Sequence, residues 1–305
     1  MISGTTALVG VLGQPVRHSL SPVIHNAALA AMNLDWCYLA LPCDKNKLKA
    51  VLAGLRAIDC RGLSITIPHK HDVAELCIER SQIAQRIGAV NTLIPHPDNT
   101  WTGTNTDVAG FLAPLQSKGS QWQQRNAVVV GCGGSARAVV AGLQDLQLAE
   151  VTVVGRRADA LQAFLKDLSS AILIEGCKPK ESETRLKGAL SNESDLSQLI
   201  NKADLVVNTT PVGMSKGEAD PLSCSEMPLG QELWRSLQPG TTIYDLIYTP
   251  RPTPWLEWGI SQGCEGIDGL EMLVQQGAAA LKLWSGRSEV PVDAMRAAAE
   301  SWLKT

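Results

Sequence analysis

The chain has 305 residues, and this length favours two domains, because a single hydrophobic core rarely grows beyond about 250–300 residues. Hydrophobic residues make up 45% of the chain and charged residues 19%, as is typical of a globular protein. A net charge of −3 argues against a nucleic-acid surface, and the lack of an apolar run of about 18 residues argues against a membrane span, so we expect neither partner.

Short β-branched runs alternate with helical patterns in the first part of the chain, which is typical of α/β architecture. Strands are expected at Ala7–Gly13, Trp36–Pro42, Gly62–Ile67 and Ala89–Ile94. Helices are expected at Pro22–Met32, Lys45–Ala57 and Asp72–Glu79. Ser21 is expected to cap the first of these helices, because its hydroxyl precedes a proline at the first helical position.

A second unit begins after Asp107, where a helix ending at Lys118-Gly119 is expected to connect two domains. Strands follow at "AVVV", "VTVV", "ADLVVNTT" and "GTTIYDLIY", with a helix from about Asp159 to Leu168 after the second of them. Residues 175–203 are polar, and we expect an exposed excursion with a short helix near its end. The C-terminal stretch predicts two helices that are separated around Ser285–Val290.

The eight cysteines are scattered and form neither C-x-x-C nor zinc-type spacing, which predicts reduced thiols and no metal site. The N-terminal stretch has no early basic region, and its apolar run is broken by glycine. It is therefore interpreted as a first strand and not as a signal peptide. Together these features predict a cytoplasmic protein.

The stretch "VVVGCGGSA" places Gly131, Gly133 and Ala136 in a G-x-G-x-x-A pattern between a strand and a helix. This context is typical of a dinucleotide site, where the first glycine permits a tight turn and the second lets the backbone approach a pyrophosphate. A glycine turn that serves packing alone is the alternative. The strand before, the helix after and the second strand favour the dinucleotide site.

The strand "VTVVGRR" indicates which dinucleotide is bound. An NAD site would place an acidic residue near its end for the ribose 2′-hydroxyl, but Gly155 is followed by Arg156 and Arg157. Arginines at this place suit the 2′-phosphate of NADP. Solvated arginines at a strand end are the alternative, and the missing acid makes it less attractive. We therefore predict NADP.

Several loops of the first part carry small polar side chains at expected strand ends, where open α/β sheets bind ligands. Their residue types suggest a small polyhydroxylated ligand, although each alone is an ordinary turn or capping residue. These residues are Ser19, Ser21, Thr66, Asn91 and Asp107.

In "GLSITIPHK" a strand that is expected to be buried is followed at once by Lys70. This lysine either ends the strand in solvent or is held over a substrate, and the stretch alone does not decide between the two.

The chain resembles the shikimate dehydrogenase family over nearly its whole length. The matching stretches, in order, are "GQPVRHSLSPVIHN", "ITIPHK", "GAVNTL", "GTNTDVAG", "VVGCGGSARAV", "NTTPVGM", "YDLIYTPRPTPWL" and "GLEMLVQQGAAALKLW". The resemblance implies NADP-dependent interconversion of 3-dehydroshikimate and shikimate in the biosynthesis of aromatic amino acids. It also implies an N-terminal three-layer α/β substrate domain and a Rossmann-type, doubly wound parallel-sheet NADP domain.

Family roles carry over by position. Lys70 matches the catalytic lysine, which is paired with Asp107. Ser19 and Ser21 match the serines that bind the substrate carboxylate. The remaining substrate contacts match Thr66, Asn91, Asp107, Tyr248 and Gln276.

The cofactor site follows in the same way. The phosphate loop matches Gly131, Cys132, Gly133, Gly134 and Ser135. The strand end at the adenosine ribose matches Gly155, Arg156 and Arg157. The nicotinamide side matches Thr210, Leu246 and Gly269. The resemblance further implies that residues 1–106 and the C-terminal helices 269–305 form the substrate domain, and that residues 107–268 form the NADP domain.

Three positions depart from the family pattern, namely Ser64, Gly155 and Ala160. Ser64 replaces the usual Asn near the substrate, so a dual quinate/shikimate dehydrogenase stays open as an alternative. A ligand-sensing protein without turnover and a methylenetetrahydrofolate dehydrogenase are further alternatives. The retained Lys70 and Asp107 disfavour the first of these, and the first-domain loops disfavour the second. The sequence leaves open whether the chain is a monomer or a homodimer, and whether Lys70 is protonated.

Overall fold

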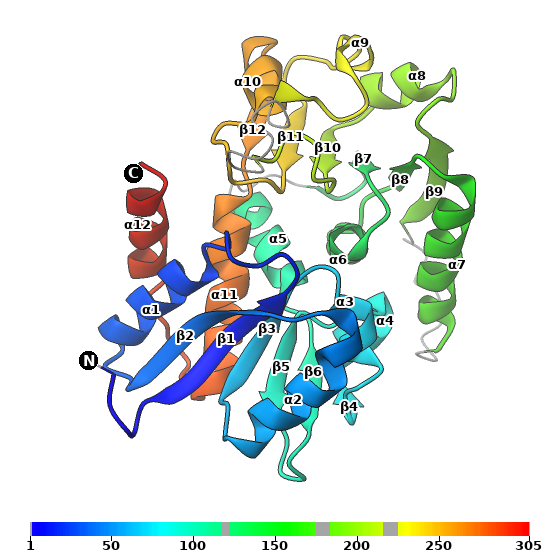
Figure 1. Ribbon diagram of the computed structural model, residues 1–305. Helices are drawn as coiled ribbons and strands as arrows, with labels where there is room; N and C mark the ends of the chain where they lie inside the picture. Colours follow the sequence, from blue (N-terminus) through cyan, green and yellow to red (C-terminus); the bar gives the residue numbers. More distant parts are fainter. Residues whose placement is uncertain (1, 118–121, 175–183, 216–224, 305) are drawn as a thin grey trace. The chain divides into compact units, whose positions relative to one another are not determined.

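The computed structural model describes residues 2–117, 122–174, 184–215 and 225–304 (Figure 1). The chain divides into two compact units, Met1–Ala113 with Glu271–Thr305 and Pro114–Leu270. The boundaries fall inside helix α5 (Asp107–Ser117) and at the start of helix α11 (Leu270–Ser285), whereas the sequence analysis placed them after residues 106 and 268. The expected end of α5 at Lys118-Gly119 lies outside the described residues.

The first unit contains a six-stranded sheet with the order β2-β1-β3-β5-β6-β4. Strands β2, β1 and β3 are parallel, whereas β5 runs antiparallel to both β3 and β6. The bounds are β1 Ala7–Gly13, β2 Trp36–Pro42, β3 Gly62–Ile65, β4 Glu79–Arg80, β5 Thr92–Pro95 and β6 Trp101–Thr104. The first two strands have the predicted bounds.

Two predicted strand bounds were wrong by a few residues. Strand β3 ends at Ile65 and not at Ile67, because the chain turns after it and the carbonyl of Thr66 accepts a hydrogen bond from the amide of His69 (3.0 Å). Strand β5 begins at Thr92 and not at Ala89, since the amide of Val90 is bonded to Lys70 instead of to a neighbouring strand.

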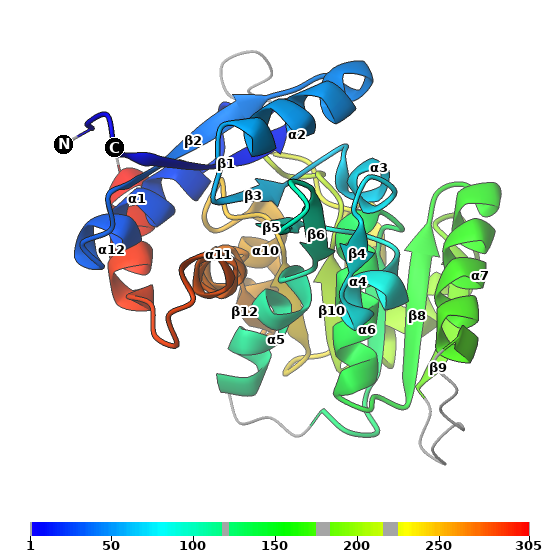
Figure 2. The same cartoon turned by 90° about the horizontal axis from the view of Figure 1, so that it is seen from below.

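Helices cover both faces of this sheet (Figures 1 and 2). Neighbouring strand residues point to opposite faces, so Leu63 joins a core with Leu48 and Leu52 of α2 while Gly62 faces Trp284 of α11. The helices are α1 Ser21–Ala31, α2 Leu48–Ala57 after a 3-10 turn at Lys45–Lys47, α3 Lys70–Ala74, α4 Gln82–Ile87, α11 and α12 Val292–Trp302.

Two predictions for these helices were wrong. The helix expected at Asp72–Glu79 is the shorter α3, and Glu79 belongs to strand β4. Ser21 does not cap α1 from outside, because it is the first helical residue and Leu20 occupies the cap position. The amide of Ser21 instead donates to Oγ of Ser19 (3.2 Å).

The second unit contains a parallel six-stranded sheet with the order β12-β11-β10-β7-β8-β9. The strand order reverses between β7 and β10, and a doubly wound sheet binds its ligand at this switch point. The bounds are β7 Asn126–Val130, β8 Glu150–Gly155, β9 Arg185–Leu190, β10 Leu205–Asn208, β11 Thr242–Asp245 and β12 Glu265–Ile267.

The helices of this unit are α6 Gly134–Asp145, α7 Ala158–Ile174, α8 Leu196–Asn201, α9 Gln231–Trp234 and α10 Pro254–Ser261. Helix α7 continues beyond the predicted end at Leu168. The predicted exposed excursion at residues 175–203 was partly wrong, because β9 pairs with β8 as an edge strand. Its predicted short helix is α8, and residues 175–183 lie outside the described part.

Within the described ranges, none of the helices is long and apolar enough to cross a membrane. The same ranges hold no group of three or more His, Cys, Asp or Glu side chains placed to bind a metal. Six cysteines are free thiols there, namely Cys37, Cys43, Cys60, Cys77, Cys132 and Cys264.

Candidate active site

A partly buried ion pair joins Lys70 to Asp107 in the first unit. Nζ of Lys70 lies 2.5 Å from Oδ2 of Asp107, and their side chains are only 12% and 8% exposed. Lys70 is the first residue of α3, and Asp107 lies in the first turn of α5, where the helix dipole favours a negative charge. A charged pair that is held this close and shielded from water has a fixed geometry, unlike a solvated lysine at a strand end.

Asn91 fixes the other oxygen of the same carboxylate. Its Nδ2 donates to Oδ1 of Asp107 (2.7 Å) and to Oγ1 of Thr106 (3.0 Å), and its Oδ1 accepts from the amide of Thr106 (2.8 Å). Asn91 is 2% exposed. The carboxylate of Asp107 is therefore oriented by an amide on one oxygen and by the ammonium on the other.

The strand topology explains why residues distant in sequence meet at this edge of the sheet. Strands β1 and β3 are parallel, so the loops that follow them, with Ser19, Ser21 and Thr66, leave from the same edge. Strand β5 is antiparallel to β3 and pairs with β6, which brings its start at Asn91 and the chain after Thr104 to that edge as well.

The two serines and Thr66 have local contacts that orient them. Oγ of Ser19 donates to Oγ of Ser21 (3.1 Å). Gly13 is required beside Thr66, because a Cβ atom there would lie 2.3 Å from Cγ2 of the threonine. Gln276 lies on α11, where its Nε2 donates to the carbonyl of Leu273 (2.8 Å). Tyr248 is half-buried in the loop after β11 of the second unit.

Ser64, the departure from the family pattern, is 6% exposed in β3. The fully buried Tyr38 lies beside it, and burial raises the pKa of the Tyr38 hydroxyl. His25 stacks on Tyr38 with the ring centroids 4.0 Å apart. Burial lowers the pKa of His25 to about 4, so this histidine is neutral and its Nδ1 donates to the carbonyl of Ser21 (2.9 Å).

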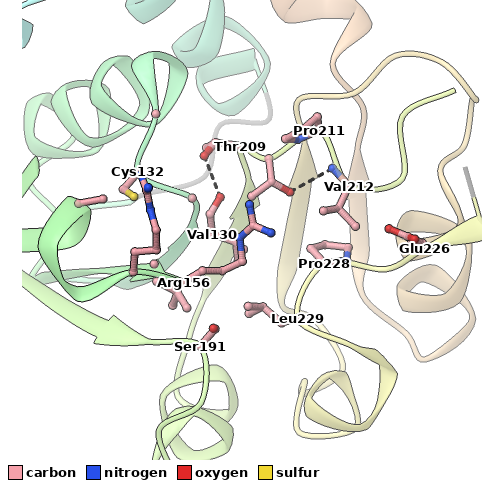
Figure 3. A pocket seen from close by; sticks show the side chains of 17 residues that line it. Val130, Cys132, Arg156, Ser191, Thr209, Pro211, Val212, Glu226, Pro228 and Leu229 are labelled. Atoms are coloured by element: carbon pink, nitrogen blue, oxygen red, sulfur yellow. Dashed lines mark hydrogen bonds between the residues drawn. The ribbon is translucent and has the colours of Figure 1, made fainter. Parts of the chain in front are cut away.

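The second unit contains a pocket of about 860 Å³ at the carboxyl ends of its strands (Figure 3). Seven of the predicted cofactor residues line it, namely Gly131, Cys132, Gly133, Gly155, Arg156, Arg157 and Thr210. Four others are not among the lining residues, namely Gly134, Ser135, Leu246 and Gly269. Gly134 and Ser135 begin helix α6 directly behind the turn.

The glycine turn has the backbone that the sequence pattern predicts. Gly131 has a φ of +108°, and a Cβ atom there would lie 2.5 Å from Oγ1 of Thr209. A Cβ atom at Gly133 would meet nothing within 4 Å, so the space in front of the α6 N-terminus is open. Free N–H groups and open space at a helix N-terminus fit a pyrophosphate.

Two arginines that follow strand β8, Arg156 and Arg157, line the pocket together with Ala160. The acid of an NAD site is missing here, as the sequence indicated, while Glu226 lines the pocket from a distant segment of the chain. These donors fit the 2′-phosphate of NADP.

Gly269 lies against Leu246, because a Cβ atom at Gly269 would lie 2.0 Å from the Leu246 carbonyl oxygen.

Sequence reasoning missed several lining residues. Thr209 bonds the carbonyl of Val130 at the end of β7 (2.7 Å), and Ser191 follows β9 (Figure 3). Thr209 lies in the "NTT" stretch, whose position after β10 at the switch point was an available signal. Ser191 follows a strand that the sequence analysis did not predict, so nothing pointed to it.

Known proteins match the chain over its whole length. Residues 11–93 match the shikimate dehydrogenase substrate binding domain, and residues 269–300 match the shikimate 5′-dehydrogenase C-terminal domain. The shikimate dehydrogenase (NADP(+)) of Nostoc sp. (strain PCC 7120) is 46% identical over 299 residues, which cover 98% of this chain and 97% of that protein.

Two crystal structures have the same fold. A shikimate dehydrogenase in complex with NADP+ has a TM-score of 0.85 at 30% identity, and the match covers 100% of this chain and 98% of that protein. The shikimate 5-dehydrogenase of Thermus thermophilus in complex with NADP(H) and shikimate has a TM-score of 0.80 at 30% identity, with 97% and 99% coverage. This chain therefore belongs to the shikimate dehydrogenase family.

Proposed function

We propose that this protein catalyses the reversible, NADP-dependent reduction of 3-dehydroshikimate to shikimate. The observation that carries the proposal is the partly buried Lys70–Asp107 pair, whose atoms lie 2.5 Å apart at the sheet edge where the polar loops meet. Relatives at 40–46% identity named shikimate dehydrogenase (NADP(+)) support the same activity.

Lys70 is proposed as the proton donor in the reducing direction. NADPH, when bound, supplies the hydride to the carbonyl carbon of the substrate. The ammonium of Lys70 gives its proton to the carbonyl oxygen, which becomes the new hydroxyl, and the resulting amine is reprotonated from solvent. Asp107 keeps the ammonium in place and is itself held by Asn91. In the oxidising direction the proton moves the opposite way.

The other predicted substrate residues, Tyr248 among them, are proposed to bind and orient the substrate. Ser19 and Ser21 would hold its carboxylate, and Thr66, Asn91, Gln276 and Tyr248 would contact its other groups. Fixing several polar groups of a small ring restricts it to the orientation in which one carbon can accept hydride.

The pocket of the second unit is proposed to hold NADP. The turn at Gly131–Ser135 would contact the pyrophosphate, while Arg156 and Arg157 would bind the 2′-phosphate. Thr210, Leu246 and Gly269 would lie on the nicotinamide side. We further propose a cytoplasmic location.

An absorbance assay with the purified protein tests the proposal. Each of shikimate and quinate is combined with each of NADP and NAD, and formation of the reduced cofactor is followed in the near ultraviolet. We expect the highest kcat/KM for shikimate with NADP. A higher kcat/KM with quinate would establish the dual enzyme instead, and tight NADP binding without turnover would establish a sensing role. The relatives named shikimate dehydrogenase do not favour these alternatives.

A further inference from the structure

A buried pair of polar side chains links two neighbouring strands of the second unit. Asn208 ends β10 and Asp245 ends β11, and the two residues are register partners in the parallel sheet. Both are 0% exposed. Nδ2 of Asn208 donates to Oδ1 of Asp245 (3.0 Å). The pair therefore joins the two loops that follow these strands.

Asp245 holds the loop between β11 and α10. Its Oδ1 also accepts from the amide of Ile247 (3.1 Å), and its Oδ2 accepts from Oγ1 of Thr253 (2.8 Å), the N-cap of α10. Both ends of the loop are thus bonded to one carboxylate. This loop carries Leu246 and Tyr248, two predicted contacts of the cofactor and substrate.

Asn208 holds the loop after β10. Its Oδ1 accepts from the amide of Thr210 (3.0 Å) and from Oγ1 of the same residue (2.7 Å). Oγ1 of Thr210 in turn accepts from the amide of Val212 (3.3 Å), the bond drawn in Figure 3. Thr210 and Val212 both line the cofactor pocket.

Burying the charged carboxylate of Asp245 costs free energy. Desolvation raises the pKa of Asp245 to about 6, although the Thr253 hydroxyl, the Ile247 amide and the Asn208 amide group favour its charged form. Each of these three donors is neutral. A fold needs no buried charge to join two strands, since apolar or neutral groups do so at lower cost. The carboxylate is explained if it accepts three hydrogen bonds at once and so sets the loop geometry.

We propose that Asn208 and Asp245 are positioning residues, which hold the loops after β10 and β11 in one register so that Thr210, Leu246 and Tyr248 are aligned for hydride transfer. This inference rests on the proposed function. Hydride transfer depends steeply on geometry, and a misplacement of about 1 Å costs about 100-fold in rate.

Three variants of the full-length protein test the proposal. Asp245→Ala leaves three donors without an acceptor, whereas Asp245→Asn keeps the shape and an acceptor oxygen. Thr241→Val is the matched control, because Thr241 is also buried next to β11, and its hydroxyl bonds the carbonyl of Ala203 at the opposite end of the strand. Steady-state kinetics with shikimate and NADP are measured well below the unfolding temperature, together with thermal unfolding.

We expect Asp245→Ala to lower kcat by about tenfold or more and to raise the KM for NADP, and Asp245→Asn to recover most of both. Thr241→Val should lose stability with unchanged kinetics. If Asp245→Ala does not fold, Asn208→Ala is measured in its place. This variant removes the hydrogen bond between the two strands but leaves Asp245 its bonds from the Ile247 amide and the Thr253 hydroxyl. It should raise the KM for NADP about tenfold.

Folded Asp245→Ala or Asn208→Ala with wild-type kcat and KM would overturn the proposal, since a merely structural pair would change stability alone. Failure of the proposed function is recognised separately, because the wild-type protein itself would then show no turnover of shikimate.

Discussion

Lys70→Met separates two roles of the Lys70–Asp107 pair, proton transfer and stabilisation of the fold. Methionine keeps the length of the lysine stem and removes the ammonium. Among the residues that the structure describes, the carboxylate of Asp107, 8% exposed, then keeps only the Asn91 amide at 2.7 Å as a partner, together with its place in the first turn of α5. Leaving one charge of a buried pair unpaired costs about 3–5 kcal/mol, and the helix dipole offsets about 0.3–1 kcal/mol of it.

We therefore expect the free energy of unfolding to fall by about 2–5 kcal/mol in Lys70→Met. Adding Asp107→Asn removes the unpaired charge while its side-chain oxygen still accepts from Asn91. The double variant should therefore regain most of the lost stability. Its activity should not return, because loss of a general acid costs about 10²–10⁴ in kcat and no other proton donor is restored.

The assay combines urea unfolding with NADPH-dependent reduction of 3-dehydroshikimate for the wild type, both single variants and the double variant. A kcat near that of the wild type in Lys70→Met would refute the assignment of the proton donor. Equal stability of Lys70→Met and the double variant would refute the argument that an unpaired carboxylate is buried there.

Three further predictions concern the second unit. Burial raises the pKa of Asp245 from 3.8 in the unfolded chain to about 6 in the folded protein, so the folded state binds the carboxyl proton more tightly than the unfolded state. The free energy of unfolding of the wild type should therefore fall by up to about 3 kcal/mol as the pH rises from 4 to 6. Urea unfolding of Asp245→Asn should not show this fall in stability between pH 4 and 6. The same pH profile in the variant and the wild type would contradict the prediction. Arg156→Asp should raise the KM for NADP about ten- to a hundredfold, whereas an unchanged NADP preference over NAD counts against Arg156. Gly131→Ala should unfold at a lower urea concentration than the wild type, because Gly131 has a positive φ and an added Cβ atom would clash with Thr209. Gly133→Ala should keep the stability of the wild type but bind NADP more weakly in titrations, since its Cβ atom would enter only the open space of the pocket.

The α/β class and the glycine turn were predictable because they depend on local patterns. Strands β1 and β2 are long enough to show an apolar run, and their predicted bounds are those observed. Strand β4 has two residues and β12 has three, too few to show any period. Strand β9 is an edge strand that buries only Ala189 and exposes Arg185 and Lys187, and it follows a polar stretch, so the composition of this region suggested a loop.

The site was less predictable, because its contacts join distant parts of the chain. The spacing of Lys70 and Asp107 in the sequence says nothing of their separation, and their pairing was expected from the family resemblance alone. Likewise, the bonds of Asn208 to Asp245 depend on the register of two strands. No single-sequence pattern encodes that register, although "NTT" and "YDLIY" were both recognised as strand ends.

The division of the chain has a consequence for its synthesis on the ribosome. The first unit needs α11, because the indole of Trp284 donates to the carbonyl of Leu93 (2.9 Å) and fills the space above Gly62. That helix is translated after the whole second unit. Until α11 is made, the nascent N-terminal sheet therefore has one face covered only in part, by α1, whose His25 stacks on Tyr38 of β2. In nascent chains stalled before residue 271, the second unit should consequently become resistant to protease before the first unit does.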